Sequence, residues 1–155
     1  MIAVEPNEFR RKKAAEMGAD VVIDPLETDP VQAVTDMTKG SGAEVVLEMS
    51  GNARAIDQGT RMLARGGRMS LLGLPEGAVT LDLNDQVIFK EARLHGITGR
   101  EMFRTWQQTT TLLSTGRVDV SPVITHRFGL ERFEDAFATT ASGSAGKVIM
   151  VPGGA

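Results

Sequence analysis

Residues 45–52 read Val-Val-Leu-Glu-Met-Ser-Gly-Asn and join an unbroken apolar run to a turn that opens a helix. Three adjacent aliphatic residues, followed by polar residues and glycine, are typical of a strand that is buried on both faces. Asn52 stands where a helix N-cap is expected, because apolar residues recur at helical spacing after it until Gly66 and Gly67. The segment therefore predicts a buried strand, a tight turn and a helix.

The same pattern occurs on both sides of this segment. Upstream, one strand is expected to end at Val4 and another to cover Val21–Ile23, each followed by a helix that stops near a glycine, Gly18 or Gly40. Downstream, Met69–Leu74 is expected to form a fourth strand. Strands that alternate with helices and read as continuous apolar runs favour a parallel sheet in the doubly wound α/β arrangement.

Beyond Pro75 the pattern is less regular. A strand is expected over Leu94–Thr98, followed by a long helix that ends near Gly116. From Val123 onward the sequence predicts a strand, a helix and a last strand over Lys147–Val151, without a glycine-rich turn between them.

Composition restricts the possible functions. The 155 residues carry 17 Lys+Arg against 20 Asp+Glu, a formal net charge of -3, so we expect neither nucleic acid nor an anionic membrane as a partner. The Cys count is 0, which excludes disulfides, thiolate zinc ligands and a cysteine nucleophile. No apolar run approaches the roughly 20 residues that span a bilayer, and the amino end lacks a signal-peptide pattern, so a cytoplasmic location is expected.

Glu5 occupies the position of a possible ribose-binding carboxylate. In dinucleotide-binding folds a Gly-x-Gly-x-x-Gly turn follows the first strand, and an acidic residue ends the second. The sequence contains no such glycine motif, yet Glu5 directly follows the first apolar run, as if the preceding strand and turn lay upstream of Met1. The pattern alone leaves open whether Glu5 binds ribose or belongs to an ordinary strand-to-helix turn.

Five collinear stretches carry a resemblance to a known family. They are Glu5–Arg10, Leu47–Gly51, Val87–Lys90, Gly96–Phe103 and Val123–Phe128. These stretches resemble the zinc-dependent, medium-chain alcohol dehydrogenase family, and within it the members that oxidise L-threonine. The resemblance extends over essentially the whole chain, and the block Gly-Ile-Thr-Gly-Arg-Glu at residues 96–101 is its most specific part.

The resemblance implies the carboxyl-terminal half of such an enzyme. It implies an incomplete doubly wound, Rossmann-like parallel sheet that lacks its first strand, within an NAD-binding domain at residues 1–121. Residues 122–155 would be a short return segment that belongs to the catalytic domain in the family. The family's zinc ligands, proton relay and glycine-rich turn all precede this region, so the resemblance assigns no catalytic or metal-binding residue here.

The resemblance also implies a reaction and partners. These are hydride transfer to NAD from the secondary alcohol of L-threonine, or of another polyol or secondary alcohol, in a cytoplasmic homo-oligomer. Zinc would be bound by residues that this chain lacks, and the isolated chain would be inactive.

Cofactor-binding residues are carried over only where the motifs match. Glu5 would accept hydrogen bonds from the adenosine ribose hydroxyls, with Arg10 beside the same ribose. A carboxylate about 4 Å from a phosphate charge costs on the order of 4 kcal/mol at an effective dielectric of about 20, so NAD is expected over NADP. The basic run at residues 10–13 leaves a 2′-phosphate open as an alternative, and the other interpretation of Lys12 and Lys13 is a solvated helix face.

Two further segments match family positions that border the nicotinamide half of the cofactor. Gly73 fits such a position because a closely approaching ligand leaves no room for a Cβ. Without the resemblance, Leu72 and Ile97 would be interpreted as core residues. The candidates are Leu72, Gly73, Leu74, Ile97 and Thr98.

Other polar and aromatic residues receive structural interpretations. The only histidines, His95 and His126, lack a second ligand at metal-site spacing. Glu48 ends a buried strand and is expected to bind the amides of the following turn, although it could instead face the cofactor. Ser50 lacks the Gly-x-Ser-x-Gly elbow of a hydrolase, and Trp106 is expected at an interface or in the core.

Three functions stay open at this point. The chain is the NAD-binding half of a dehydrogenase, a stand-alone nucleotide-binding or regulatory module, or a non-functional remnant that self-associates. In the family's sheet the absent strand lies between the strand ending at Val4 and that of residues 45–47. Its loss leaves two strand edges without a partner, so we expect self-association or rearranged strand pairing.

Overall fold

The computed structural model describes residues 1–99 and 101–153, so Arg100 of the family-like block lies outside the described residues. The chain forms two compact units, Met1–Glu27 with Glu101–Ala155, and Thr28–Arg100. We call them the first and the second unit. The predicted division at residue 121 concerns the domains of the family and stays a prediction.

The first unit contains β1 (Ile2–Val4), α1 (Glu8–Glu16), β2 (Val21–Ile23), α4 (Arg104–Ser114), the 3-10 turn η2 (Ser121–Val123), β6 (Ile124–Gly129), the 3-10 turn η3 (Leu130–Arg132), α5 (Phe133–Ala141) and β7 (Lys147–Val151). The second unit contains α2 (Pro30–Met37), β3 (Ala43–Glu48), α3 (Ala53–Met62), β4 (Leu63–Leu71), the π-helical turn η1 (Asn84–Ile88) and β5 (Arg93–Gly96).

Every strand pairing among the described residues is parallel, which confirms the expected α/β class. The pairs are β1 with β2, β3 with β4, β4 with β5, and β6 with β7. The described strands form three separate sheets, with the orders β1-β2, β3-β4-β5 and β6-β7. Parallel strands linked by helices are typical of Rossmann-like folds. That the doubly wound sheet lacks its first strand stays a prediction.

Polar caps determine where the helices of this sheet begin. Asn7 Oδ1 accepts the Arg10 amide at 3.0 Å and opens α1, and Asp29 Oδ1 accepts the Val31 amide at 2.9 Å and opens α2. Asn52 caps α3 as the sequence predicts. Each cap satisfies an amide that has no partner in the first helical turn, so the strand-to-helix turns adopt defined conformations.

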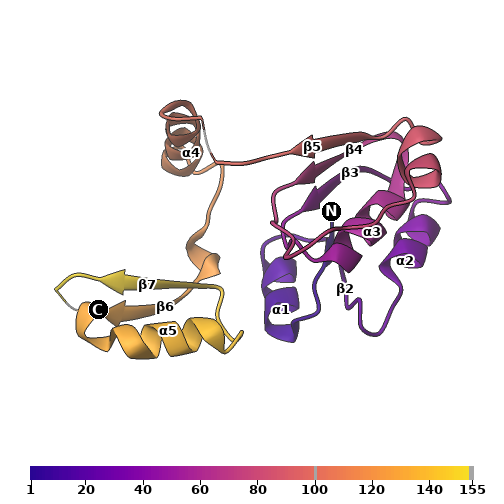
Figure 1. The fold of residues 1–155 in the computed structure, drawn as a ribbon. Coiled ribbons are helices and arrows are strands. Elements are labelled where there is room, and N and C mark those ends of the chain that lie inside the picture. The colour runs from indigo at the N-terminus through magenta and orange to yellow at the C-terminus, as the bar shows by residue number, and fades with distance from the viewer. Residues whose placement is uncertain (100, 154–155) are drawn as a thin grey trace. The chain divides into compact units, whose positions relative to one another are not determined.

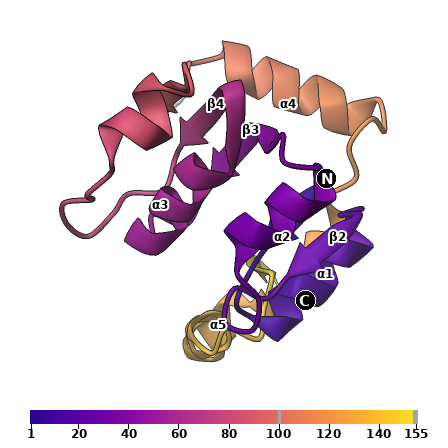
Figure 2. The same ribbon diagram turned by 90° about the vertical axis from the view of Figure 1, so that its right-hand side faces the viewer.

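The core of the second unit lies between α3 and one face of its sheet. Val46, Met69 and Leu94 are register partners on β3, β4 and β5, and all three pack against a cluster that includes Ile56 of α3. Met69 is fully buried. Figure 2 shows α3 running alongside β3 and β4, so a single helix covers this face.

Two sequence-based expectations about this unit are wrong. The helix after Asn52 ends at Met62 and not at Gly66, because the chain turns extended at Leu63 and enters β4 there. The strand at residues 45–47 is not buried on both faces, since Val45 is 42% and Leu47 is 63% exposed. Side chains alternate along a strand, and within the described part of the second unit α3 covers only the face that carries Val46.

The first unit confirms the strand, helix and strand expected at the carboxyl end. α5 runs along the β6–β7 pair (Figure 1), and α1 packs on β1 and β2. α4 contains no buried residue, and Trp106 is half exposed, so the core interpretation of Trp106 is wrong. No helix among the described residues is long and apolar enough to cross a membrane.

Candidate functional site

Glu5 lies at the carboxyl end of β1, and hydrogen bonds hold both its backbone and its carboxylate. Its amide donates to the Ile23 carbonyl at 3.1 Å, which continues the β1–β2 ladder by one residue. Its carboxylate Oε1 accepts the Asn7 amide at 2.9 Å and Arg10 Nε at 3.0 Å. The described residues place no donor on Oε2, and the side chain is 26% exposed. One carboxylate oxygen is therefore available to a ligand hydroxyl.

Every cation of the basic run at residues 10–13 has an acidic partner. The pairs are Arg10 with Glu5 at 3.0 Å, Arg11 with Asp24 at 2.8 Å, Lys12 with Glu8 at 2.7 Å and Lys13 with Glu16 at 2.6 Å. The hydrogen bond and charge of Lys12 lower the pKa of the Glu8 carboxyl. Without a ligand, each of these cations therefore faces an acidic side chain of the same chain.

The structure brings the two nicotinamide-side segments to one edge of the second unit's sheet. The Leu72 amide donates to the Glu48 carbonyl at 3.0 Å, and the Ile97 amide donates to the Leu71 carbonyl at 2.9 Å. Leu72–Leu74 and Ile97–Thr98 thus follow the carboxyl ends of β4 and β5, where ligands bind in open α/β sheets. Leu72 and Ile97 are each 44% exposed, so the alternative that they are core residues is wrong.

Glu48 organises the turn at this edge. Its side chain is buried, and its carboxylate accepts the Ser50 amide at 2.9 Å, the Ser50 hydroxyl at 2.5 Å and the Gly51 amide at 3.1 Å. Three donors compensate the burial of the carboxylate. The expectation that Glu48 binds turn amides is confirmed, and the Ser50 hydroxyl is engaged by a carboxylate rather than by a histidine.

Gly73 is required by the protein backbone itself. A Cβ at this position would collide with the Gly51 nitrogen and lie 2.6 Å from the Ser50 carbonyl carbon. The end of β4 therefore packs directly on the turn that Glu48 holds. The sequence correctly indicates a position without room for a side chain, but the neighbour that fills the space is the chain and not a ligand.

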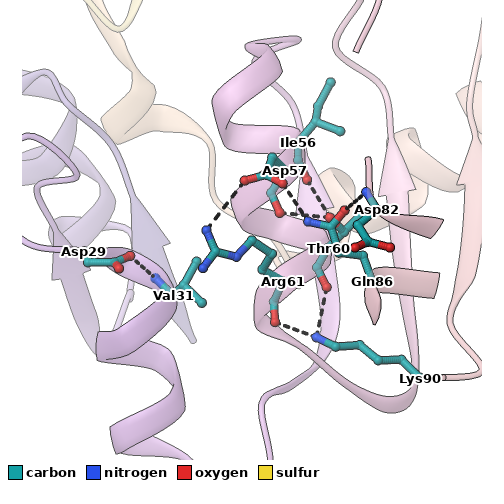
Figure 3. A network of polar contacts seen from close by, with 9 residues as sticks. All are labelled: Asp29, Val31, Ile56, Asp57, Thr60, Arg61, Asp82, Gln86 and Lys90. Carbon is teal, nitrogen blue, oxygen red and sulfur yellow. Dashed lines mark hydrogen bonds and ion pairs between the residues drawn. The ribbon is translucent and has the colours of Figure 1, made fainter. Parts of the chain in front are cut away.

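A partly buried polar network anchors the segment that leads into β5 (Figure 3). Gln86 of η1 donates to Asp57 Oδ1 at 2.6 Å and accepts the Asp82 amide at 2.8 Å. Lys90 Nζ donates to the carbonyls of Thr60, Arg61 and Leu63 at 3.1, 2.5 and 2.9 Å. The Thr60 carbonyl also accepts the Leu63 amide, so Lys90 binds the last turn of α3 and the first residue of β4 together.

Sequence analysis assigned no role to Gln86 or Lys90, although the family-like stretch Val87–Lys90 pointed to this region. Burial lowers the pKa of the Lys90 ammonium, and the charge of Arg61 lowers it further. The Gly66 amide also donates to the Lys90 carbonyl at 2.6 Å. β5, and with it Ile97 and Thr98, is thereby fixed to α3 and β4.

The second unit also has a cavity of about 480 Å³ at the opposite edge of its sheet. Its lining includes Gly42, Leu63 and Lys90, which lie at or before the amino ends of β3, β4 and β5. None of the predicted site residues lines this cavity. The cavity therefore does not coincide with the candidate cofactor residues.

The described residues contain no group of three or more His, Cys, Asp or Glu side chains that could hold a metal ion. His95 is an exposed residue of β5. His126 of β6 shares a hydrogen bond of 2.9 Å between its Nδ1 and the Thr125 hydroxyl, and its ring stacks on Phe128. Both histidines thus lack the ligand partners of a zinc site.

Comparison with known proteins identifies the family of this chain. Residues 1–115 match the family described as zinc-binding dehydrogenase. The chain belongs to the zinc-binding dehydrogenase family. This agrees with the family resemblance of the five sequence stretches and with the parallel strand pairing.

Several curated relatives of this chain are L-threonine 3-dehydrogenases. The protein from Thermococcus kodakarensis is 46% identical over 153 residues, and the protein from Bacillus subtilis is 47% identical over 152 residues. Each alignment covers 98% of this chain and 44% of the relative. The chain therefore spans less than half the length of the curated relatives it matches.

Solved structures of dehydrogenases share the fold. The structure of 2R,3R-butanediol dehydrogenase from Bacillus subtilis matches with a TM-score of 0.87 at 27% identity, covering 97% of this chain and 43% of that protein. A zinc-binding dehydrogenase from Sinorhizobium meliloti, bound to NADP, matches with a TM-score of 0.87 at 26% identity, covering 97% of this chain and 44% of that protein. These matches confirm the α/β, Rossmann-like fold class.

Proposed function

We propose that this chain is the NAD-binding half of a zinc-dependent dehydrogenase that oxidises the secondary alcohol of L-threonine by hydride transfer to NAD. The substrate part of the proposal is supported by the identity of 46% and 47% to L-threonine 3-dehydrogenases. The cofactor part is supported by one observation in particular. Glu5 presents a carboxylate oxygen at the carboxyl end of β1, beside a basic run whose cations are all paired.

In this proposal the residues of the chain bind and orient the cofactor. Glu5 accepts hydrogen bonds from the adenosine ribose hydroxyls, and Arg10 lies beside the same ribose. The backbone of Leu72–Leu74 and Ile97–Thr98 borders the nicotinamide half, where the exposed Leu72, Leu74 and Ile97 side chains supply an apolar surface that excludes water. NAD, when bound, supplies the hydride acceptor.

Zinc does not fit the described residues of this chain, because they offer no cluster of ligands for it. We therefore propose that zinc binding and proton transfer belong to the part of the relatives that this chain does not span. The isolated chain is then expected to bind NAD without turnover. The division into residues 1–121 and 122–155, the cytoplasmic location and the homo-oligomer are parts of the same proposal.

Calorimetric titration of the purified chain with NAD and with NADP tests the proposal. We expect saturable NAD binding, weaker NADP binding, and a loss of NAD affinity of about tenfold or more in Glu5→Ala, the range expected for hydrogen bonds to a charged group. Glu8→Ala is the matched control, because Glu8 lies in the same region of the chain but pairs only with the exposed Lys12.

Each result of this titration has a distinct meaning. NAD affinity that is equal in Glu5→Ala and in the unaltered chain contradicts the assignment of Glu5. No heat with either nucleotide, from a folded sample, contradicts NAD binding by this chain and favours a non-binding remnant. NAD binding that depends on Glu5 is also compatible with a regulatory module, and turnover of L-threonine after addition of the relatives' remaining half separates the two.

A further inference from the structure

We propose that Arg11 is a positioning residue that holds the Glu5 carboxylate in place for a ribose diol. The inference deepens the proposed function and rests on it for the identity of the ligand. The position of Arg11 in the sequence gives no indication of this role, because it is one of four consecutive basic residues. The contacts of its guanidinium group distinguish it from the other three.

The Arg11 guanidinium joins two separate segments of the first unit. Its Nη1 donates to the Glu5 carbonyl at 3.0 Å and to the Pro6 carbonyl at 2.6 Å. Its Nη2 forms an ion pair with Asp24 Oδ2 at 2.8 Å. Asp24 directly follows β2, and its other oxygen accepts the Leu26 amide at 2.9 Å. Arg11 thus ties the β1–α1 turn to the end of the neighbouring strand.

The pair is shielded from water, unlike its neighbours on the helix. The side chains of Arg11 and Asp24 are 19% and 15% exposed, whereas those of Lys12 and Glu8 are 70% and 72% exposed. A shielded ion pair with additional hydrogen bonds holds its geometry more tightly than an exposed one, because water neither screens nor replaces it.

Arg11 holds the Glu5 carbonyl, whereas the hydrogen bonds between β1 and β2 hold only the Glu5 amide. The Glu5 amide is already bonded to the Ile23 carbonyl, and Arg11 holds the carbonyl on the other side of the same residue. With both ends of the Glu5 backbone held, the hydrogen bonds from the Asn7 amide and from Arg10 Nε orient the carboxylate. Recognition of two adjacent hydroxyls by one carboxylate needs such an orientation, since binding groups must lie within about 0.5 Å of the productive position.

Lysine cannot replace arginine in this arrangement. The planar guanidinium offers donors in a fixed fork, so it can reach two carbonyls and one carboxylate together. An ammonium group is a point charge on a flexible stem and lacks that geometry. Arg11→Lys therefore keeps the charge but loses the orientation, which separates a positioning role from a purely electrostatic one.

The test compares two ligands, NAD and its analogue with a 2′-deoxyadenosine ribose. We expect the unaltered chain to prefer NAD, because the analogue lacks one hydroxyl that Glu5 would bind. In Arg11→Lys we expect the affinity for NAD to fall about tenfold while the affinity for the analogue changes little. The ratio of the two affinities then approaches one. Lys12→Gln, the neighbouring exposed cation, should keep the preference.

A general loss of structure gives a different pattern. If Arg11→Lys weakens both ligands equally, or weakens neither, the positioning role is overturned. Should Arg11→Lys fail to fold, Asp24→Asn provides the second variant, because it keeps the shape of the side chain while removing the charge that holds Nη2. Asp24→Asn is expected to reduce the preference in the same direction.

A measurement without ligand separates the failure of this inference from the failure of the proposed function. We expect amide hydrogen exchange at Asn7, whose N–H donates to Glu5 Oε1, to accelerate in Arg11→Lys and not in Lys12→Gln. Unchanged exchange at Asn7 overturns the role of Arg11 even if NAD binds. Accelerated exchange in a chain that binds no NAD supports the role of Arg11 on Glu5 and contradicts the ribose ligand.

Discussion

At the scale of single residues, close backbone packing at the end of β4 determines which side chains are tolerated. The Gly73 Cα faces the Ser50–Gly51 peptide, so that even a methyl group would overlap backbone atoms. Backbone atoms cannot rotate away as the end of a flexible side chain can. Any substitution at residue 73 must therefore move the turn that the buried Glu48 carboxylate holds.

We predict that Gly73→Ala destabilises the chain by about 1–3 kcal/mol, the usual cost of forcing extra atoms into a packed site. Gly77→Ala is the matched control, because a Cβ there meets no atom within 4 Å, and its effect should stay within about 0.5 kcal/mol. Urea unfolding followed by circular dichroism measures both. Equal stability of the two variants would show that residues 50–51 and 73 are not packed as described.

Sequence analysis predicted where several of these residues lie along the fold better than it predicted the contacts that they make. Glu48 was expected to bind turn amides because a carboxylate at the end of a buried strand needs donors, and the structure shows those donors. Gly73 was expected to make room for a ligand. No pattern in the sequence shows that residues 50–51 fold back onto the end of β4, so the true neighbour could not be inferred. Glu5 was placed correctly after the first strand, but its contacts with Asn7 and Arg10 depend on side-chain orientations that sequence spacing does not give.

At the scale of elements, the junction of α3 and β4 depends on a residue that is distant in sequence. Glycines at 66 and 67 predicted the end of the helix, yet α3 ends four residues earlier, at Met62. Lys90, 27 positions beyond Leu63, bonds the carbonyls at that end. Local signals such as glycine indicate that a helix ends nearby. They do not show which distant side chain, here Lys90, donates hydrogen bonds to the carbonyls at that end.

We predict that Lys90→Met destabilises the second unit by about 1–2 kcal/mol, because three carbonyls at the junction of α3 and β4 lose a charged donor and hydrogen bonds to a charged group contribute about that amount. Arg54→Met is the control, since it removes the same charge from an exposed position at the start of α3. Urea unfolding gives the stability, and amide hydrogen exchange at Gly66, which donates to the Lys90 carbonyl, gives the local effect. Slower or unchanged exchange at Gly66 in Lys90→Met would contradict the role of Lys90.

At the scale of the whole molecule, the parallel ladders leave strand edges without partners. Among the described residues β1 pairs only with β2, and β3 pairs only with β4. The continuous apolar pattern of β3 indicated a strand buried on both faces, but within this chain one face is open. A continuous apolar pattern indicates that both faces of a strand are covered by other atoms. It does not say that these covering atoms belong to the same chain.

These edges make self-association the expected state of the chain in solution. Unpaired strands with exposed apolar side chains offer backbone donors and acceptors to a second copy.

Leu47→Lys places a charge on β3, where the side chain is 63% exposed, and charged edge residues oppose strand-to-strand pairing. We predict that this substitution weakens association about tenfold, because it removes the burial of one leucine from the contact. Leu74→Lys is the control, since Leu74 is 86% exposed and lies beyond the end of β4. Light scattering coupled to size-exclusion chromatography, over a range of concentrations, measures the mass of each variant. A monomeric unaltered chain at all concentrations, or equal association in the two variants, would show that the β3 edge does not drive assembly.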